Sequence, residues 1–182
     1  MTDLMDYSGD FDPAFSYEDF SKETLQKLLE TYSKYILRID GYWYISVMDK
    51  WGNDGAFECD VKVWEKMLPW EVSKISDALN IKGDNLAALM KYFQVAPWMW
   101  NLAFDIDFKN PNHSVVTITH CPTLVSLEKE GTGREKPICR ELEPKMMEAM
   151  AHHFNPEIKV TGLKMPPRTD YKDCCCQWEF KL

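Results

Sequence analysis

Apolar residues recur every three or four positions through the first fifty residues, a spacing that predicts a long helix. Ser16 with Asp19 three residues later is typical of a helix start. The apolar stripe keeps its phase through Gly41, so we expect one helix to about Lys50, bent at the glycine. The residues that form this stripe are Leu25, Leu28, Leu29, Tyr32, Ile36, Ile39 and Trp43.

Three further helices are predicted before residue 97. Asn53 or Asp54 can cap the first of them, and Pro69 can open the second at its first turn. The third fits residues 85–94. The apolar face of the first carries Phe57, Val61, Trp64 and Leu68.

After Pro97 the hydrophobic period changes from about 3.6 to two, which predicts a half-buried strand. A turn at Asn110-Pro111-Asn112 leads into a β-branched run over residues 114–120, so we expect a hairpin. The alternating apolar residues of the first strand are Trp98, Trp100, Leu102, Phe104, Ile106 and Phe108.

The last third of the chain predicts a helix and a second hairpin. A glycine-containing loop precedes the helix over 138–154, and Pro144 either kinks that helix or marks its true start. Strands are expected at 158–164 and 174–182. The predicted fold class is α+β: N-terminal helices packed on one face of a four-stranded antiparallel sheet, with one further helix between the two hairpins.

Composition sets the broad class of protein. The chain has 182 residues, 45% of them hydrophobic, with 21 Lys and Arg against 29 Asp and Glu, a net charge of −8. The acidic balance argues against nucleic-acid binding, and no apolar run is long enough for a membrane span. The N-terminus lacks the pattern of a signal peptide, so we expect a cytoplasmic protein whose cysteines are reduced.

Most of the negative charge lies in residues 1–20, which contain six acids and no Lys or Arg. We therefore expect an acidic aromatic arm over 1–20 and a single α+β domain over 21–182. The arm also carries five aromatic rings, so it either docks on its own body or on a second subunit, giving a homodimer, or frays as a free terminus.

Five of the six cysteines follow residue 120, so the candidate chemistry lies toward the C-terminus. In a strand, Cys174 and Cys176 share the core face with α-carbons ~6.6 Å apart, while Cys175 faces outward. With Cys139 and either His120 or Cys121, these thiols could hold zinc or iron. The alternatives are inert core thiols and a redox or nucleophilic thiol.

Cys139 is the cysteine whose thiolate the sequence favours most. It would lie in the first turn of a helix, near Arg134, Lys136 and Arg140, where positive charge favours a thiolate. If the protein is an enzyme, we expect Cys139 or Cys121 to be its nucleophile. His153 could be the base only through tertiary contact, because ~21 Å of helix separates it from Cys139.

Tryptophans form a second group of candidates. Trp43, Trp98, Trp100 and Trp178 all occupy positions predicted to face the core. They could line a pocket for a small apolar or aromatic ligand. A fully packed core is the alternative.

Several short motifs resemble those of known families. They are His120-Cys121-Pro122, Cys139-Arg140, His153-Phe154-Asn155-Pro156, Pro166-Pro167, the run from Cys176 to Phe180 and the run from Leu37 to Tyr44. Together they resemble an uncharacterised cytosolic family related to the L-2-amino-thiazoline-4-carboxylate hydrolase-like proteins. The C-terminal part is also similar to the four-vinyl-reductase small-molecule-binding domain. The resemblance implies a ligand-binding α+β fold in which Cys121, Cys139 and Cys176 occupy recurring cysteine positions.

Three functional hypotheses follow. The first is a cytosolic small-molecule-binding sensor or accessory protein with an aromatic pocket and a cysteine-rich metal or redox site. The second is a hydrolase of a small cyclic amide or thiazoline carboxylate, using a cysteine nucleophile or metal-activated water. The third is a dimeric interaction protein that pairs subunits through the acidic arm.

Overall fold

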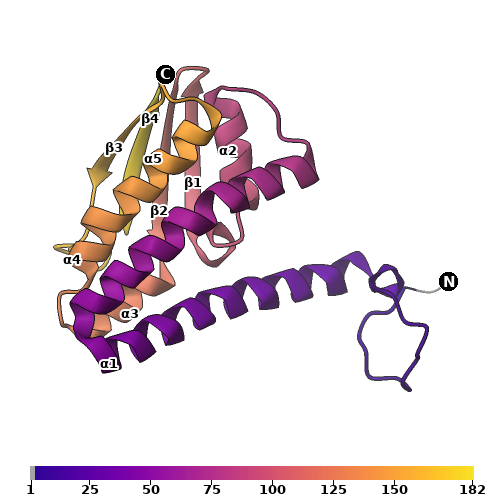
Figure 1. Ribbon diagram of the computed structural model, residues 1–182. Helices are drawn as coiled ribbons and strands as arrows, with labels where there is room; N and C mark the ends of the chain where they lie inside the picture. The colour runs from indigo at the N-terminus through magenta and orange to yellow at the C-terminus, as the bar shows by residue number, and fades with distance from the viewer. Residues whose placement is uncertain (1–2) are drawn as a thin grey trace.

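The computed structural model describes residues 3–182, and its longest element, helix α1 (Lys22–Leu79), is divided in two by a glycine. Gly52 has φ 76° and ψ 171°, backbone angles that essentially only glycine adopts. We call residues 22–51 the first limb and residues 53–79 the second limb (Figure 1). The bend expected at Gly41 is therefore wrong, because the chain reverses at Gly52.

The second limb continues through Pro69 without interruption, so the separate helix expected to open there does not exist. It ends at Asn80, which takes the left-handed conformation typical of a helix C-terminus. Helix α2 (Leu86–Val95) follows, and the Asn85 side chain accepts a hydrogen bond from the Ala88 amide. This helix agrees with its prediction to within a residue.

Two antiparallel hairpins form one four-stranded sheet, as predicted. The strands are β1 (Ala103–Asn110), β2 (His113–His120), β3 (Lys159–Lys164) and β4 (Cys176–Lys181), in the order β1-β2-β4-β3. The first strand begins later than predicted, because Met99–Asn101 form a 3-10 turn instead. The amide of Met99 donates to the Ala96 carbonyl and that of Asn101 to the Trp98 carbonyl.

The segment between the hairpins holds more helix than the one predicted. Helix α3 (Pro122–Glu130) replaces part of the expected loop, and α4 (Glu135–Pro137), a π-helical segment (Ile138–Leu142) and α5 (Glu143–Phe154) then run on as one helix. The wider π turn accommodates Pro144, which has no amide hydrogen for the Arg140 carbonyl that an α-helix would pair with it.

The helices cover one face of the sheet, and the main core lies between the two layers (Figure 1). The second limb packs along α5. Trp178 and Phe180 from β4 meet Phe93 from α2, with the ring centres of the two phenylalanines 5.4 Å apart. The opposite face of the sheet is polar, with Gln177 donating to Thr117 and His113 paired with Glu179.

The described part of the acidic arm, residues 3–20, closes on itself and on the start of α1. The Leu4 amide donates to the Asp19 carbonyl at 2.8 Å, and the Thr24 hydroxyl donates to the Met5 carbonyl at 2.9 Å. Phe15 packs against Tyr7 and Phe20. The arm lies at the far end of the first limb, away from the sheet (Figure 1).

None of the helices described between residues 3 and 182 is both long and apolar enough to cross a membrane.

Candidate functional site

Three of the candidate cysteines meet in one apolar cluster beneath the end of β2. Cys121 caps helix α3, Cys139 lies in the π-helical segment, and Cys176 is the first residue of β4. All three pack against Ile118 and Leu124. The sequence could not show this convergence, because the three residues come from three separate elements.

Cys174 and Cys175 occupy positions different from those predicted. Strand β4 begins only at Cys176, so the expected alternation does not reach back to them. Cys175, predicted to face outward, is 2% exposed, and its thiol donates to the Thr119 carbonyl at 3.6 Å. Cys174, predicted as a metal ligand beside Cys176, lies in the preceding loop and is not part of the apolar cluster.

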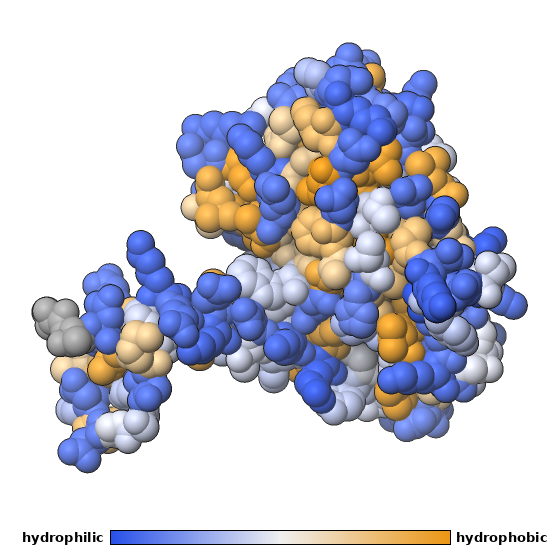
Figure 2. All heavy atoms as spheres, turned by 180° about the vertical axis from the view of Figure 1, so that it is seen from behind, coloured by the Kyte–Doolittle hydropathy of each residue, from blue (hydrophilic) through white to orange (hydrophobic). Residues whose placement is uncertain are grey.

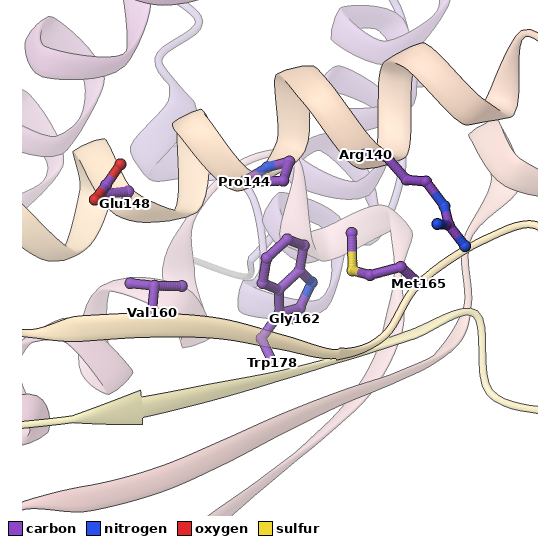
Figure 3. A pocket seen from close by; sticks show the side chains of 7 residues that line it. All are labelled: Arg140, Pro144, Glu148, Val160, Gly162, Met165 and Trp178. Atoms are coloured by element: carbon purple, nitrogen blue, oxygen red, sulfur yellow. The ribbon is translucent and has the colours of Figure 1, made fainter.

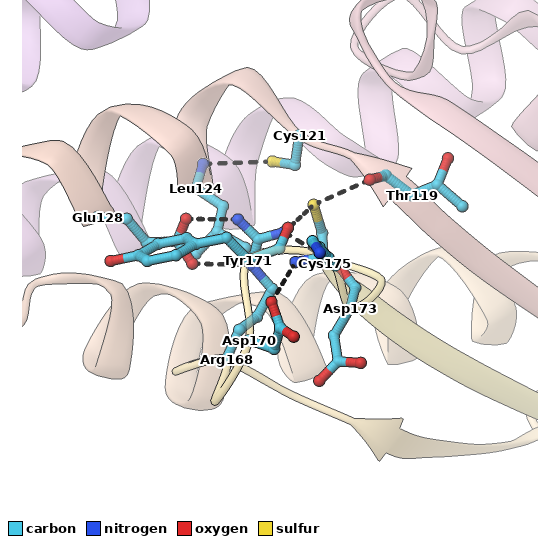
Figure 4. Close-up of polar contacts among 10 residues, drawn as sticks. Thr119, Cys121, Leu124, Glu128, Arg168, Asp170, Tyr171, Asp173 and Cys175 are labelled. Atoms are coloured by element: carbon cyan, nitrogen blue, oxygen red, sulfur yellow. Dashed lines mark hydrogen bonds and ion pairs between the residues drawn. The ribbon is translucent and has the colours of Figure 1, made fainter.

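A buried ion pair holds that loop over Cys175 (Figure 4). The Arg168 guanidinium donates two hydrogen bonds to Glu128 of α3, at 2.9 and 2.5 Å, and a third to the Tyr171 carbonyl. Arg168 also donates to Cys175 Sγ at 3.8 Å. This ion pair fixes the loop to α3, because each of the three guanidinium nitrogens donates to a protein acceptor.

The two histidine candidates do not join the cysteines. His120 is exposed at the end of β2 and lines a surface hollow of about 370 Å³ with Glu128 and Arg168. His153 is exposed near the end of α5, where its ring meets the edge of Phe154. Within residues 3–182, no histidine is hydrogen-bonded to a cysteine, and His120 belongs to no group of side chains that could hold a metal ion.

Three carboxyl groups that the sequence analysis did not single out lie together beside the thiols. Asp40 comes from the first limb, Asp60 from the second limb and Glu143 from the start of α5. Asp60 is 6% exposed. Burial, and then the charge of Asp40, raise the pKa of Asp60 to about 7. Burial, and then the charges of Asp60 and Asp40, raise the pKa of Glu143 to about 7 as well.

One signal in the sequence could have identified two of these acids. Asp60 falls within the apolar face of Phe57, Val61 and Trp64, and Glu143 follows Cys139 by four residues on the inward stripe of its helix. An acid on an apolar stripe is unusual unless it is paired. We call Asp40, Asp60, Glu143, Cys121, Cys139 and Cys176 the acid–thiol cluster.

The thiols of this cluster are held in the neutral form. Burial raises the pKa of Cys121 to about 11. Burial, together with the charge of Glu143, raises the pKa of Cys139 and Cys176 further. The expectation that Cys139 has the best favoured thiolate is therefore wrong.

The cations expected near Cys139 are engaged elsewhere. Arg134 pairs with Glu130 and stacks over the Tyr44 ring, 5.0 Å from its centre. Arg140 donates to the Pro166 carbonyl at 2.5 Å. Its side chain lines the hollow that Figure 3 shows. The charge around Cys139 is thus dominated by carboxylates.

An unpaired hydrogen-bond donor lies next to Cys176. The indole nitrogen of Trp178 is buried and has no hydrogen-bond partner within the described residues, and its N–H lowers the pKa of Cys176 against the larger effect of burial. A neutral thiol is a weak acceptor, whereas a thiolate would accept this hydrogen bond well. The indole N–H is therefore the group next to Cys176 that would stabilise a thiolate, and burial together with Glu143 outweighs it.

As the chain stands, no three Cys, His, Asp or Glu side chains between residues 3 and 182 are arranged closely enough to hold one metal ion. The thiols and carboxyl groups of the cluster lie near one another but do not form a finished coordination sphere.

The tryptophans do not form the expected aromatic pocket. Trp43 is 41% exposed and Trp100 is 44% exposed, so the prediction that they face the core is wrong. Trp98 and Trp178 do pack against the main core. Trp178 also lines a surface depression of about 350 Å³ between α5 and β3 (Figure 3). Its other lining residues are Arg140, Pro144, Glu148, Val160, Gly162 and Met165.

Fold and cluster together define an α+β protein with helices on one face of an antiparallel sheet and a half-buried group of acids and thiols. The chain belongs to a family of unknown function, DUF6125, whose model matches residues 18–182. No curated protein and no solved structure matches the chain.

Proposed function

We propose that the protein binds a divalent transition-metal ion, zinc or iron, at the acid–thiol cluster, as a metal-dependent sensor or accessory protein. Cys121, Cys139 and Cys176 would supply sulfur ligands, and Glu143 would supply an oxygen. The observation that carries the proposal is the packing of three half-buried thiols against one small cluster, with the Glu143 carboxyl close enough to raise the pKa of Cys139 and Cys176.

Electrostatics supports a cation at this position. Asp40 raises the pKa of Asp60, and both of these acids raise the pKa of Glu143. Glu143 in turn raises the pKa of Cys139 and Cys176. A bound divalent ion reverses this relation, because it stabilises carboxylates and thiolates alike and displaces their protons. Three thiolates and one carboxylate form a four-ligand set suited to tetrahedral zinc.

Two neighbouring groups would stabilise the charged sulfur atoms. Cys121 already accepts a hydrogen bond from the Leu124 amide at 3.4 Å, at the positive end of α3. The unpaired indole N–H of Trp178 lies beside Cys176. Such outer hydrogen bonds typically change metal affinity 10- to 100-fold.

Metal binding would require the ligands to close around the ion. The π-helical segment that carries Cys139 is a local irregularity of a kind found frequently at functional sites. Cys139 and Glu143 are four residues apart on one continuous helix, so both side chains would have to turn toward Cys121 and Cys176 from the same side of that helix.

Zinc titration of the purified, reduced chain against a chromophoric chelator tests the proposal. We expect about one equivalent to bind, and Cys139→Ser and Cys176→Ser each to weaken binding at least about 10-fold. Cys59→Ser is the matched control, because Cys59 is a half-buried thiol in a separate small cluster with Tyr44 and Val47. Absence of zinc uptake, or equal loss in all three variants, would refute the metal site.

A second candidate function is hydrolysis of a small cyclic amide or thiazoline carboxylate. The observation that favours it is the pair Asp60 and Glu143, whose pKa values of about 7 suit proton transfer at neutral pH. The raised pKa of Cys121 and Cys139 weighs against a cysteine nucleophile. Ring opening of 2-aminothiazoline-4-carboxylate should then be lost in Glu143→Gln but kept in Glu148→Gln. If the zinc-loaded chain shows no turnover, this candidate fails.

A further inference from the structure

The apolar stripe of the first limb faces solvent instead of the core. Leu29, Tyr32, Ile36, Ile39 and Trp43 are between 41% and 56% exposed. Figure 2 shows that the limb projects from the body of the protein.

Other residues attach the limb to the body. The Ser33 hydroxyl donates to the Pro97 carbonyl at 2.6 Å, and Asn101 donates back to Ser33 Oγ at 2.7 Å. Nearer Gly52, Tyr44 donates to Asn53 at 3.0 Å. The limb therefore has two faces, one attached to the body and one exposed apart from the Tyr32 hydroxyl, which lies 3.3 Å from the Tyr17 hydroxyl of the arm.

We propose that a second copy of this chain packs antiparallel along that stripe, so that two first limbs form a symmetric helix pair. Its residues (25, 29, 32, 36, 39 and 43) are spaced alternately by four and three, the repeat of a coiled-coil seam. This alternation reads the same in both directions, as a two-fold symmetric interface requires. The midpoint of the stripe is residue 34, so the two-fold axis crosses the helix pair at that level. Each residue then lies opposite its mirror position in the other copy: Leu25 opposite Trp43, Leu29 opposite Ile39, and Tyr32 opposite Ile36.

The area of the stripe is sufficient for a stable dimer. Tyr35 and Tyr42 flank it and are 61% and 63% exposed. With the five exposed residues of the seam, Leu25 being half-buried, they present seven large side chains, each leaving on the order of 100 Å² accessible, or roughly 700 Å² per copy. A standard protein interface buries about 800 Å² per partner.

Charge at the two ends of the stripe favours the antiparallel direction. Lys50 occupies the seam position one heptad after Trp43. Antiparallel pairing brings it to the level of Glu18 in the acidic arm of the other copy, where residues 3–20 contain six acids and no basic residue. Parallel pairing would instead place the two acidic arms side by side.

Sedimentation velocity on the full chain tests the pairing with two isoleucines of the same helix. Ile36 and Ile45 are both 43% exposed but lie nine residues apart, on opposite sides of the limb. We expect the wild type and Ile45→Glu to sediment at twice the chain mass of 21.3 kDa, and Ile36→Glu at that mass itself. Far-ultraviolet circular dichroism checks that the helix content is kept. A monomeric wild type, or equal behaviour of the two variants, overturns the proposal.

A mixing experiment tests the direction of the helices. Tyr32→Lys and Ile36→Glu should each be monomeric alone. In an antiparallel pair the new lysine of one chain lies opposite the new glutamate of the other, so an equimolar mixture should regain the dimer mass. In a parallel pair the two residues never face each other. A mixture that stays monomeric beside a dimeric wild type refutes the antiparallel alignment.

Discussion

Replacing Asp60 by Asn should stabilise the metal-free protein, and the effect should grow with pH. Asp60 is 6% exposed, and burial and Asp40 raise its pKa from 3.8 to about 7. The folded chain therefore holds a proton between about pH 4 and pH 7 that the unfolded chain has released. Stability falls as pH rises through that window and is lowest above pH 7.

The size of the effect follows from the two pKa values. The difference between 3.8 and about 7, at about 1.36 kcal/mol per pH unit, gives at most about 4 kcal/mol above pH 7. Solvent reaches part of the carboxyl group and screens its charge, so we expect about 2 kcal/mol. Asn keeps the shape of the side chain and removes the charge.

Urea unfolding followed by tryptophan fluorescence measures this effect, and the chain contains seven tryptophans as probes. The free energy of unfolding of Asp60→Asn should exceed that of the wild type by about 2 kcal/mol at pH 8 and by much less at pH 4.5. Asp49→Asn, at an exposed position of the first limb, is the control and should change stability by less than about 0.5 kcal/mol at both pH values. A destabilised Asp60→Asn protein, or a difference that does not vary with pH, would contradict the reasoning.

Three further substitutions test other parts of the structure. Arg168→Met should lower the free energy of unfolding in urea by about 3 kcal/mol, because it leaves Glu128 buried without its partner. Arg168→Lys should lower it by less, because lysine keeps the positive charge. Tyr92→Phe should cost about 2 kcal/mol in the same assay, since the hydroxyl donates to the buried Glu71 at 2.6 Å; a neutral change would mean that water replaces it. Gly52→Ala should lower the thermal midpoint, at a cost of about 1–3 kcal/mol, since alanine disfavours φ 76°; an unchanged midpoint would show that the chain turns there in another conformation.

Local patterns in the sequence predict most of the elements. The hairpin turn at 110–112 and the cap at Asn85 lie where the structure has element boundaries, because turns and caps depend on neighbouring residues. Helix α3 was not predicted. It buries only Leu124 and Leu127, and its cap is a cysteine, which is not one of the usual capping residues.

Tertiary contacts explain the errors. The alternating pattern over Trp98–Leu102 resembles a strand, but Asn101 donates to Ser33 on the first limb, and the segment turns there as a 3-10 helix. A stripe of apolar residues also cannot indicate which surface will cover it, so Trp43 was assigned to a core that the chain itself does not place against it.

The acid–thiol cluster has a part that the sequence analysis named, its cysteines, and a part that depends on tertiary contacts, its carboxyl groups. The structure packs Cys121, Cys139 and Cys176 against one small apolar cluster, and they come from three separate elements. Asp40, Asp60 and Glu143 come from the two limbs and α5, so their proximity depends on the reversal at Gly52 and on the packing of the second limb along α5.

The strand order β1-β2-β4-β3 leaves β1 and β3 as the edges of the sheet. Both edges carry charged side chains: Asp105, Asp107 and Lys109 on β1, and Lys159 and Lys164 on β3. Charged edge strands oppose the addition of a strand from another molecule. The sheet is thereby protected against growth into a continuous fibre, even at high concentration, and surfaces for specific recognition are left to the helical layer.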